Sequence, residues 1–240
     1  MNVATMYLSR KDLEQIARPV IDLYKYSRVP QHHLCYNVDP TELANLLGYK
    51  VEYAHLTQDG SILGQTATVP LWTTIIDITL GETYYYLDGH TILIEKRLLC
   101  TPLAIGRRNF TIAHELAHLL LNQHSLSVDG TQYRHCCYNR KIVKKEVTNW
   151  YEWQADTLAA ALLLPPDAIE SAMFIFGLGN KMKVLSRKYS QNRYECFCSM
   201  AQFLGVSKTT LAYRMEQLGL LERNYLIEEA QQKRGVVCYG

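Results

Sequence analysis

The chain has 240 residues, of which 48% are hydrophobic and 20% charged, and a formal net charge of +2. This composition is typical of a soluble globular protein with one sizeable core, and the small net charge does not favour a nucleic acid as its main partner. No apolar run reaches the roughly 18 residues that a membrane-spanning helix needs, and the N-terminus lacks a signal-peptide pattern. We therefore expect a cytoplasmic protein without a membrane partner, whose seven cysteines are reduced.

Two helices are predicted in the N-terminal part of the chain. Residues 10–27 carry a stripe of apolar side chains at helical spacing, made of Leu13, Ile16, Val20, Leu23 and Tyr24. Asp39 begins a second helix as its N-cap, Pro40 occupies the first turn, and Glu42 completes a capping box. That helix is expected to end at Gly48, since glycine commonly follows the last helical turn.

A β region follows, with strands predicted over residues 51–56 and 72–80. The clearest hairpin signal joins residues 83–87 to residues 90–95 through Asp88-Gly89, because Asp-Gly suits a two-residue turn. We expect the second of these strands to lie at a sheet edge and to bind an extended substrate by strand addition. Its contact residues would be His90, Ile92 and Ile94. The alternative is an interior strand that is paired on both edges.

The run His114-Glu115-Leu116-Ala117-His118 lies in an apolar segment with helical periodicity. Residues four apart share one face of a helix, so each imidazole can give a nitrogen to the same Zn²⁺. Glu115 projects about 100° away around the helix axis, where it can act as general base for the attacking water. The alternative is two core histidines and a solvated glutamate. Among eight histidines, this pattern arises by chance on the order of a few per cent of the time.

A catalytic zinc with two histidine ligands needs a third protein ligand. Glu152 and Asp156 share one face of the helix predicted over residues 149–164. We assign Glu152 as the third ligand and expect Asp156 to accept the free ring N–H of a zinc histidine, His114. The alternative is an exposed acidic face. The apolar run 159–164 disfavours that interpretation because it makes the helix a buried one.

The connection between these two helices, residues 122–148, is long enough to be functional. It either lines the substrate cleft or forms a plain solvated loop, and the residues leave both interpretations open. Tyr133, His135 and Tyr151 are candidates for binding the substrate and stabilising its oxyanion. The paired and closely spaced cysteines are interpreted as buried or loop thiols rather than metal ligands; these are Cys136, Cys137, Cys196 and Cys198.

Residues 200–215 have the features of a helix-turn-helix. Gly205 suits the turn and Ser207 suits the N-cap of the second helix. Lys208 and Arg214 are the cations on that helix, fewer than a DNA-reading face usually uses. We favour a module that packs on the core or docks the substrate, and direct DNA binding remains open.

These motifs carry a resemblance to a known family. Arg-Arg-Asn-Phe-Thr before His-Glu-Leu-Ala-His, then Glu-x-x-Ala-Asp with Leu-Ala-Ala-x-Leu-Leu-x-Pro, resembles the ImmA/IrrE family of bacterial metallopeptidases over roughly residues 40–220. The resemblance implies a cytoplasmic gluzincin-type zinc peptidase that cleaves a helix-turn-helix repressor and so switches on genes. Leu158 stands where the family usually has an aromatic residue, which affects packing. Carried over onto this sequence, the resemblance makes His114, His118 and Glu152 the ligands of one zinc per chain. It makes Glu115 the general base and Asp156 the residue that supports a zinc histidine.

The sequence thus predicts an α+β fold in which a small, mostly antiparallel sheet packs on the zinc helix and on a second ligand helix. Residues 1–176 would form a zincin-like metallopeptidase domain, and residues 177–240 a C-terminal helix-turn-helix-like module. The predicted function is that of a zinc endopeptidase. The alternatives are a DNA-binding transcriptional regulator with structural or sensory zinc, and a scaffold protein with a dead site. Glu115 separates these, because a structural zinc has four protein ligands and no use for a neighbouring base.

Overall fold

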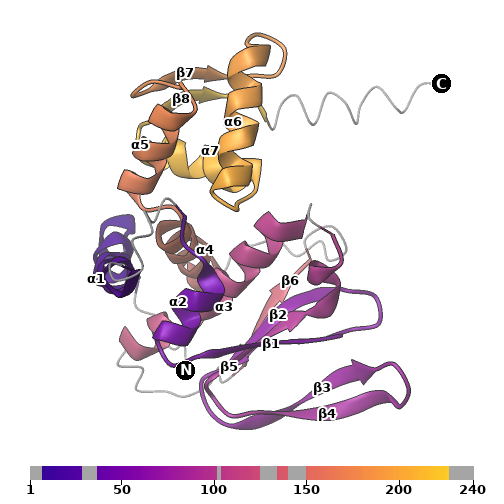
Figure 1. The fold of residues 1–240 in the computed structure, drawn as a ribbon. Helices are drawn as coiled ribbons and strands as arrows, with labels where there is room; N and C mark the ends of the chain where they lie inside the picture. The colour runs from indigo at the N-terminus through magenta and orange to yellow at the C-terminus, as the bar shows by residue number, and fades with distance from the viewer. Residues whose placement is uncertain (1–6, 29–36, 102–103, 125–133, 140–149, 227–240) are drawn as a thin grey trace, which may run out of the picture. The chain divides into compact units, whose positions relative to one another are not determined.

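The computed structural model describes residues 7–28, 37–101, 104–124, 134–139 and 150–226 (Figure 1). The chain divides into two compact units, of which the first holds residues 1–33 and 39–163 and the second holds residues 34–38 and 164–240. The domain boundary between residues 176 and 177 stays a prediction. The fold is mixed α+β with mostly antiparallel strand pairs, which confirms the predicted class.

The first unit contains a four-stranded sheet in the order β1-β5-β2-β6. Strand β1 (Lys50–Ala54) runs parallel to β5 (Thr91–Glu95), and β2 (Ile62–Ala67) runs antiparallel to both β5 and β6 (Arg134–Tyr138). Strand β5 is therefore an interior strand with both edges paired, and all five of its residues are buried. The expectation that residues 90–95 offer a free edge is wrong, because β1 and β2 already occupy both sides.

A separate two-stranded layer is formed by β3 (Leu71–Asp77) and β4 (Gly81–Leu87). The predicted hairpin between residues 83–87 and 90–95 is therefore wrong, although the turn itself forms. Gly89 has a φ of 84°, and Asp88 Oδ1 accepts a hydrogen bond from the His90 N–H. The turn reverses the direction of the chain, but the burial of each strand determines which strands pair. Strand β5 is apolar on both faces and suits a sheet interior, whereas β4 alternates exposed and half-buried residues.

The two faces of the four-stranded sheet are covered differently. Helix α3 (Ile105–His124) packs on β2, β5 and β6, and the hairpin covers the other face (Figure 1). Consecutive residues of β2 point to opposite sides. Gly64 faces Thr111 and Glu115 of α3, while Gln65 donates a hydrogen bond to Thr73 Oγ1 in the hairpin. An apolar cluster fills the hairpin side, with Leu56, Ala67, Leu87 and Leu93 at its centre.

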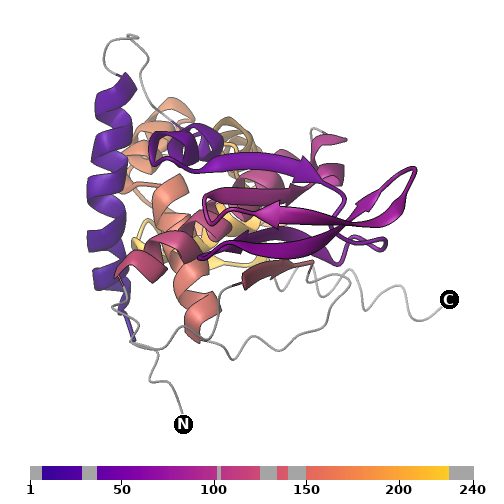
Figure 2. The ribbon, with the colours of Figure 1, turned by 90° about the horizontal axis from the view of Figure 1, so that it is seen from below.

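Among its described residues, the first unit also contains α1 (Arg10–Arg28), α2 (Pro40–Leu46), α4 (Trp150–Leu163) and a short 3₁₀ helix, η2 (Lys96–Leu99). Helix α1 packs on α4, which lies against α3, and Figure 2 shows α1 along one side of the unit. The buried stripe of α1 differs from the predicted one, since Ala17 and Ile21 replace Ile16, Val20 and Leu23 beside Leu13 and Tyr24. Helix α2 begins as predicted, with Asp39 accepting hydrogen bonds from the Thr41 and Glu42 N–H groups.

The second unit contains α5 (Pro166–Ile175), α6 (Gln191–Phe203), α7 (Lys208–Gln217) and a parallel pair of strands, β7 (Met182–Leu185) and β8 (Leu221–Asn224). The helix-turn-helix expectation is confirmed locally. Gly205 has a φ of 67° between α6 and α7, and Ser207 Oγ accepts a hydrogen bond from the Thr210 N–H. Arg214 is only 2% exposed, and its Nε–H donates to the Leu164 carbonyl. Its guanidinium therefore holds this unit together.

Helix α4 is apolar and almost fully buried in its second half. In the described ranges, no single helix is long and apolar enough to cross a membrane. Only α4 and α5 counted together, as a bent pair, reach that length and composition.

Candidate metallopeptidase site

Helices α3 and α4 bring two imidazoles and a carboxylate to one point. The Nε2 atoms of His114 and His118 lie 3.0 Å apart. Glu152 reaches both rings from α4, with Oε2 3.3 Å from His114 Nε2 and Oε1 3.6 Å from His118 Nε2. Both histidines are buried, while the Glu152 side chain is 31% exposed. These donor atoms all lie within 4.8 Å of one another, so the three residues form a candidate metal site.

Asp156 lies behind this group, one helical turn after Glu152. Its Oδ1 is 2.9 Å from His114 Nδ1, as the sequence predicts. A carboxylate in this position favours the tautomer that carries its proton on Nδ1. The Nε2 lone pair of His114 then points toward His118 and Glu152, where it could coordinate a cation.

Burial and charge pull the site's pKa values in opposite directions. Burial favours the neutral His114 ring, but hydrogen bonds to Asp156 and Glu152 outweigh it and raise the His114 pKa to about 10. The same imidazoles hold the Glu152 pKa well below its usual range, although burial opposes this. Burial lowers the His118 pKa to about 4. Because metal ligands must be deprotonated, a cation bound between these side chains would displace any proton from the imidazole nitrogens that face it.

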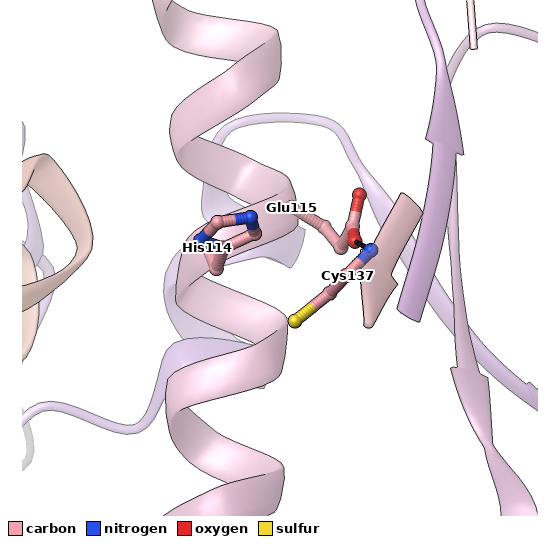
Figure 3. A group of neighbouring side chains, drawn as sticks. All are labelled: His114, Glu115 and Cys137. Carbon is pink, nitrogen blue, oxygen red and sulfur yellow. Dashed lines mark hydrogen bonds between the residues drawn. The ribbon is translucent and has the colours of Figure 1, made fainter. Parts of the chain in front are cut away.

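Glu115 is fully buried between α3 and the sheet. Its Oε1 accepts a hydrogen bond of 2.9 Å from the Cys137 backbone N–H, which Figure 3 draws as a dashed line. Its Oε2 is buried and has no hydrogen-bond partner in the described part of the chain. Burial raises the Glu115 pKa to about 7, with the Glu152 charge adding to the rise and His114 opposing it. One oxygen is therefore fixed, and the other is available to a proton donor.

Gly64 of β2 makes room for Glu115. A Cβ at this position would lie 2.6 Å from Thr111 Cγ2, closer than real Cβ contacts, and 3.0 Å from both Cγ and Oε1 of Glu115, tighter than most of them. The β2–β6 register also shifts between Ile62 and Gly64, opposite Cys137. This irregularity lies where the Cys137 N–H turns to Glu115. Sequence reasoning missed both features, and the glycine inside a strand was the available signal.

A second group of neighbouring donors consists of His114, Glu115 and Cys137 (Figure 3). It shares His114 with the first group, and His114 Nδ1 is already engaged by Asp156. The remaining Nε2 faces His118 and Glu152. The first group also has Glu152 engaging both rings, so we take it as the candidate ligand set.

The predicted substrate-binding residues lie in different environments. His135 is buried on β6, with its ring stacked 4.5 Å from the His118 ring, and burial lowers its pKa to about 3. Tyr151 also stacks on His118, at 4.9 Å, and burial raises its pKa to about 12. Tyr133 lies outside the described residues. Ile92 and Ile94 are fully buried in β5, so an extended substrate cannot pair along that strand beside them or His90.

The long connection between the ligand helices contains an ordered strand, β6, which sequence reasoning did not identify. Among the described strands, β6 pairs only with β2 and so lies at the edge of the sheet. It carries both His135 and Cys137, which contact the site through a ring and a backbone N–H. Residues 134–138 are therefore part of the sheet beside the site rather than a plain solvated loop, and a role in lining a substrate cleft stays a prediction.

A family model for peptidases, described as the IrrE N-terminal-like domain, matches residues 83–216, more than half of the chain. The match includes all of α3, β6 and α4, and with them the five residues of the candidate site. No curated protein matches the chain. The family match confirms the resemblance that the two motifs carry and supports a metallopeptidase type of function. The chain belongs to the Peptidase_M78 family, the peptidases with an IrrE N-terminal-like domain.

Proposed function

We propose that this protein is a zinc-dependent endopeptidase that cleaves a DNA-binding repressor in the cytoplasm and so derepresses genes. The observation that carries the proposal is the convergence of two histidine Nε2 atoms and the Glu152 carboxylate beside a buried glutamate. Two histidines and a glutamate are a common ligand set of catalytic zinc in peptidases.

The residues fit a zinc ion on physical grounds. Two imidazole nitrogens 3.0 Å apart repel each other unless a proton or a cation lies between their lone pairs. Asp156 accepts the His114 Nδ1 proton, which leaves Nε2 free to be a ligand. Zinc, when bound, supplies Lewis-acid chemistry that polarises a carbonyl and makes water more acidic. A stoichiometry of one zinc per chain follows from one group of three donors.

Glu115 is proposed as the general base. The Cys137 N–H fixes Oε1, so the carboxylate keeps one orientation while Oε2 accepts a proton from the attacking water. The same carboxyl group can then pass the proton to the leaving amine. Gly64 supports this role because its missing side chain gives the carboxylate its place.

The edge strand β6 replaces β5 as the proposed substrate strand. A peptide bond must be extended to reach a buried metal, and an exposed strand edge can hold such a segment through main-chain hydrogen bonds. Strand β6 has one paired edge among the described strands, and it borders the site through His135. His135 and Tyr151 would contact the substrate near the scissile carbonyl. The choice of a helix-turn-helix repressor as substrate rests on the family resemblance.

The alternative, a DNA-binding regulator with structural or sensory zinc, finds less support. Of the two cations predicted on α7, Arg214 is buried against the Leu164 carbonyl. Lys208 lies over the Tyr194 ring, 5.6 Å from its centroid. A DNA-reading helix usually needs several exposed phosphate contacts. The zinc group also has three donors rather than the four of a structural site.

The proposal is tested by incubating the purified protein with helix-turn-helix repressors encoded near its gene, and following cleavage by mass spectrometry. We expect one or a few cleaved bonds, loss of cleavage with a zinc chelator, and recovery when zinc is restored. Glu115→Gln is the matched control, because it keeps the Cys137 contact and the metal but removes the base. Cleavage by this variant at the wild-type rate would exclude Glu115 as the base. Cleavage that survives chelation would exclude the zinc mechanism.

A further inference from the structure

The outer edge of strand β4 lacks the features that normally protect an exposed edge. The β3–β4 register runs without a bulge from the Leu71–Leu87 pair to the Asp77–Gly81 pair. Strand β4 contains no lysine, arginine or proline, and Glu82 is its sole charged residue. Natural proteins usually blunt an edge strand with such residues or with bulges, because an open edge pairs readily with other chains. No described strand pairs with the outer edge of β4.

The backbone groups that face this edge follow from one hydrogen bond. The Ile76 N–H donates a hydrogen bond of 2.7 Å to the His55 carbonyl, so the backbone N–H of Ile76 points away from β4. Its partner in the ladder, Glu82, must then point its own N–H and C=O away from β3, toward the outer edge. The pattern repeats every second residue. Glu82, Tyr84 and Tyr86 therefore present their N–H and C=O groups at the edge.

The same residues carry an exposed aromatic face. The side chains of Tyr84 and Tyr86 are 75% and 50% exposed, and Trp72 on the neighbouring strand is 66% exposed. The Trp72 and Tyr86 rings are 5.1 Å apart. Tyrosine and tryptophan on an open surface are typical of protein interfaces, since they bury a large apolar area and keep a polar end. The edge and the aromatic face are continuous.

We propose that two copies of this protein pair through β4, antiparallel and around a twofold axis at Tyr84. The two hairpins then form one four-stranded sheet in which the N–H and C=O groups of Glu82, Tyr84 and Tyr86 all find partners. Tyr84 lies opposite Tyr84 of the second copy, as a cross-strand aromatic pair, and Glu82 lies opposite Tyr86. This interface is separate from the metal site.

The axis position follows from parity and charge. Because the outward groups belong to alternate residues, an antiparallel self-pairing must centre on a residue rather than between two residues. Centring on Tyr84 separates the two Glu82 carboxylates by about 14 Å along the strand, at roughly 3.4 Å per residue, beyond the screening length of about 8–10 Å. A twofold axis at Tyr85 would place Glu82 of one copy opposite Asp88 of the other, which opposes like charges. An axis at Thr83 would halve the distance between the two Glu82 residues and would leave Tyr86 outside the paired region.

A second copy fits this edge better than a passing peptide. A second copy presents the same outward N–H and C=O groups, and pairing at Tyr84 sets Glu82 opposite Tyr86 rather than opposite a like charge. One strand edge is smaller than a standard interface of about 800 Å² per partner, so the dimer should be weak and dependent on concentration.

The test is sedimentation of the full chain from micromolar to millimolar concentration. Wild type should shift from monomer to dimer, and Tyr84→Lys, which opposes two lysines at the axis, should weaken dimerisation tenfold or more. Thr74→Lys is the matched control, because it adds the same charge on the same face of β3 but away from the outer edge, and should leave the dimer unchanged. Thermal unfolding of each variant shows that the fold is retained.

A charge pair tests the register independently, should Tyr84→Lys fail to fold. Tyr86→Lys places lysine opposite Glu82 of the second copy, so dimerisation should persist and weaken with added salt. Adding Glu82→Lys to that variant opposes like charges and should abolish the dimer. The proposal is overturned if wild type stays monomeric, if Tyr84→Lys dimerises like wild type, or if Tyr86→Lys breaks the dimer as fully as the double variant. Loss of substrate binding without any change in mass would assign the edge to the substrate instead.

Discussion

The two faces of the four-stranded sheet are built from the same strands but carry opposite chemistry. On the α3 side, Gly64 and the Cys137 N–H surround the buried Glu115. On the hairpin side, Leu93 and its neighbours form an apolar cluster. Adjacent residues of one strand thus serve either the site or the core, and the core face gives the site a rigid wall. Substitutions on the two faces should therefore separate chemistry from stability.

The largest effect is expected from His118→Ala. Removing one of three donors leaves two, and stoichiometric zinc and all peptidase activity should be lost while the fold persists. Metal analysis of the purified variant measures this. His135→Ala is the matched control, because its ring stacks on His118 but does not belong to the donor group, and it should retain zinc. A full equivalent of zinc in His118→Ala would place the ligands elsewhere.

On the opposite face, Leu93→Ala should lower the free energy of unfolding by about 2–5 kcal/mol, the usual cost of a buried leucine-to-alanine change. Leu93 is fully buried on the hairpin side of β5. Zinc content and the specific activity of the folded protein should change little. Urea unfolding gives the stability, and Leu46→Ala, at a 38% exposed position, provides a mild control. Equal losses of activity and stability would show that the two faces are not separable.

The site helices could be predicted from the sequence because their information is local. Four-residue spacing fixes which side chains share a helix face, so His114 with His118, and Glu152 with Asp156, could be assigned to two faces without knowing the fold. Packing of α3 on α4 then leaves few ways for these faces to meet. The helix start at Asp39 was equally local, since its cap lies within three residues.

The strands were predicted less well because pairing is not local. The Asp88-Gly89 turn forms, but whether β5 pairs with β4 or with β1 and β2 depends on residues far along the chain. The apolar run Ile92-Leu93-Ile94 suits an interior strand, but the Asp88-Gly89 pattern favours a hairpin. Strand β6 is only five residues long and has no clear periodicity, so the sequence does not distinguish it from the surrounding connection. Its contact with Glu115 depends on tertiary structure alone.

A smaller effect than either is expected from Asp156→Ala. The change removes the acceptor of the His114 Nδ1 proton but leaves all three donors, so zinc affinity or activity should fall by about 10–100-fold. Zinc titration against a competing chelator measures the affinity. Asp156→Asn keeps an acceptor oxygen without the charge and should recover part of the loss. Wild-type affinity in Asp156→Ala would mean that His114 is oriented by packing alone.

The smallest effect is expected from Cys137→Ser, which distinguishes the two overlapping donor groups. If zinc binds His114, His118 and Glu152, the thiol is not a ligand, and the variant should keep its zinc and lose no more than about threefold in kcat/KM. Glu115 should keep its orientation because the contact comes from the backbone N–H of residue 137. Cys137→Pro removes that N–H and should lower kcat while zinc is retained, since Glu115 would lose its fixed oxygen. Loss of zinc in Cys137→Ser would instead make the thiol a ligand and assign the metal to the group that includes Glu115, which could then no longer be the base.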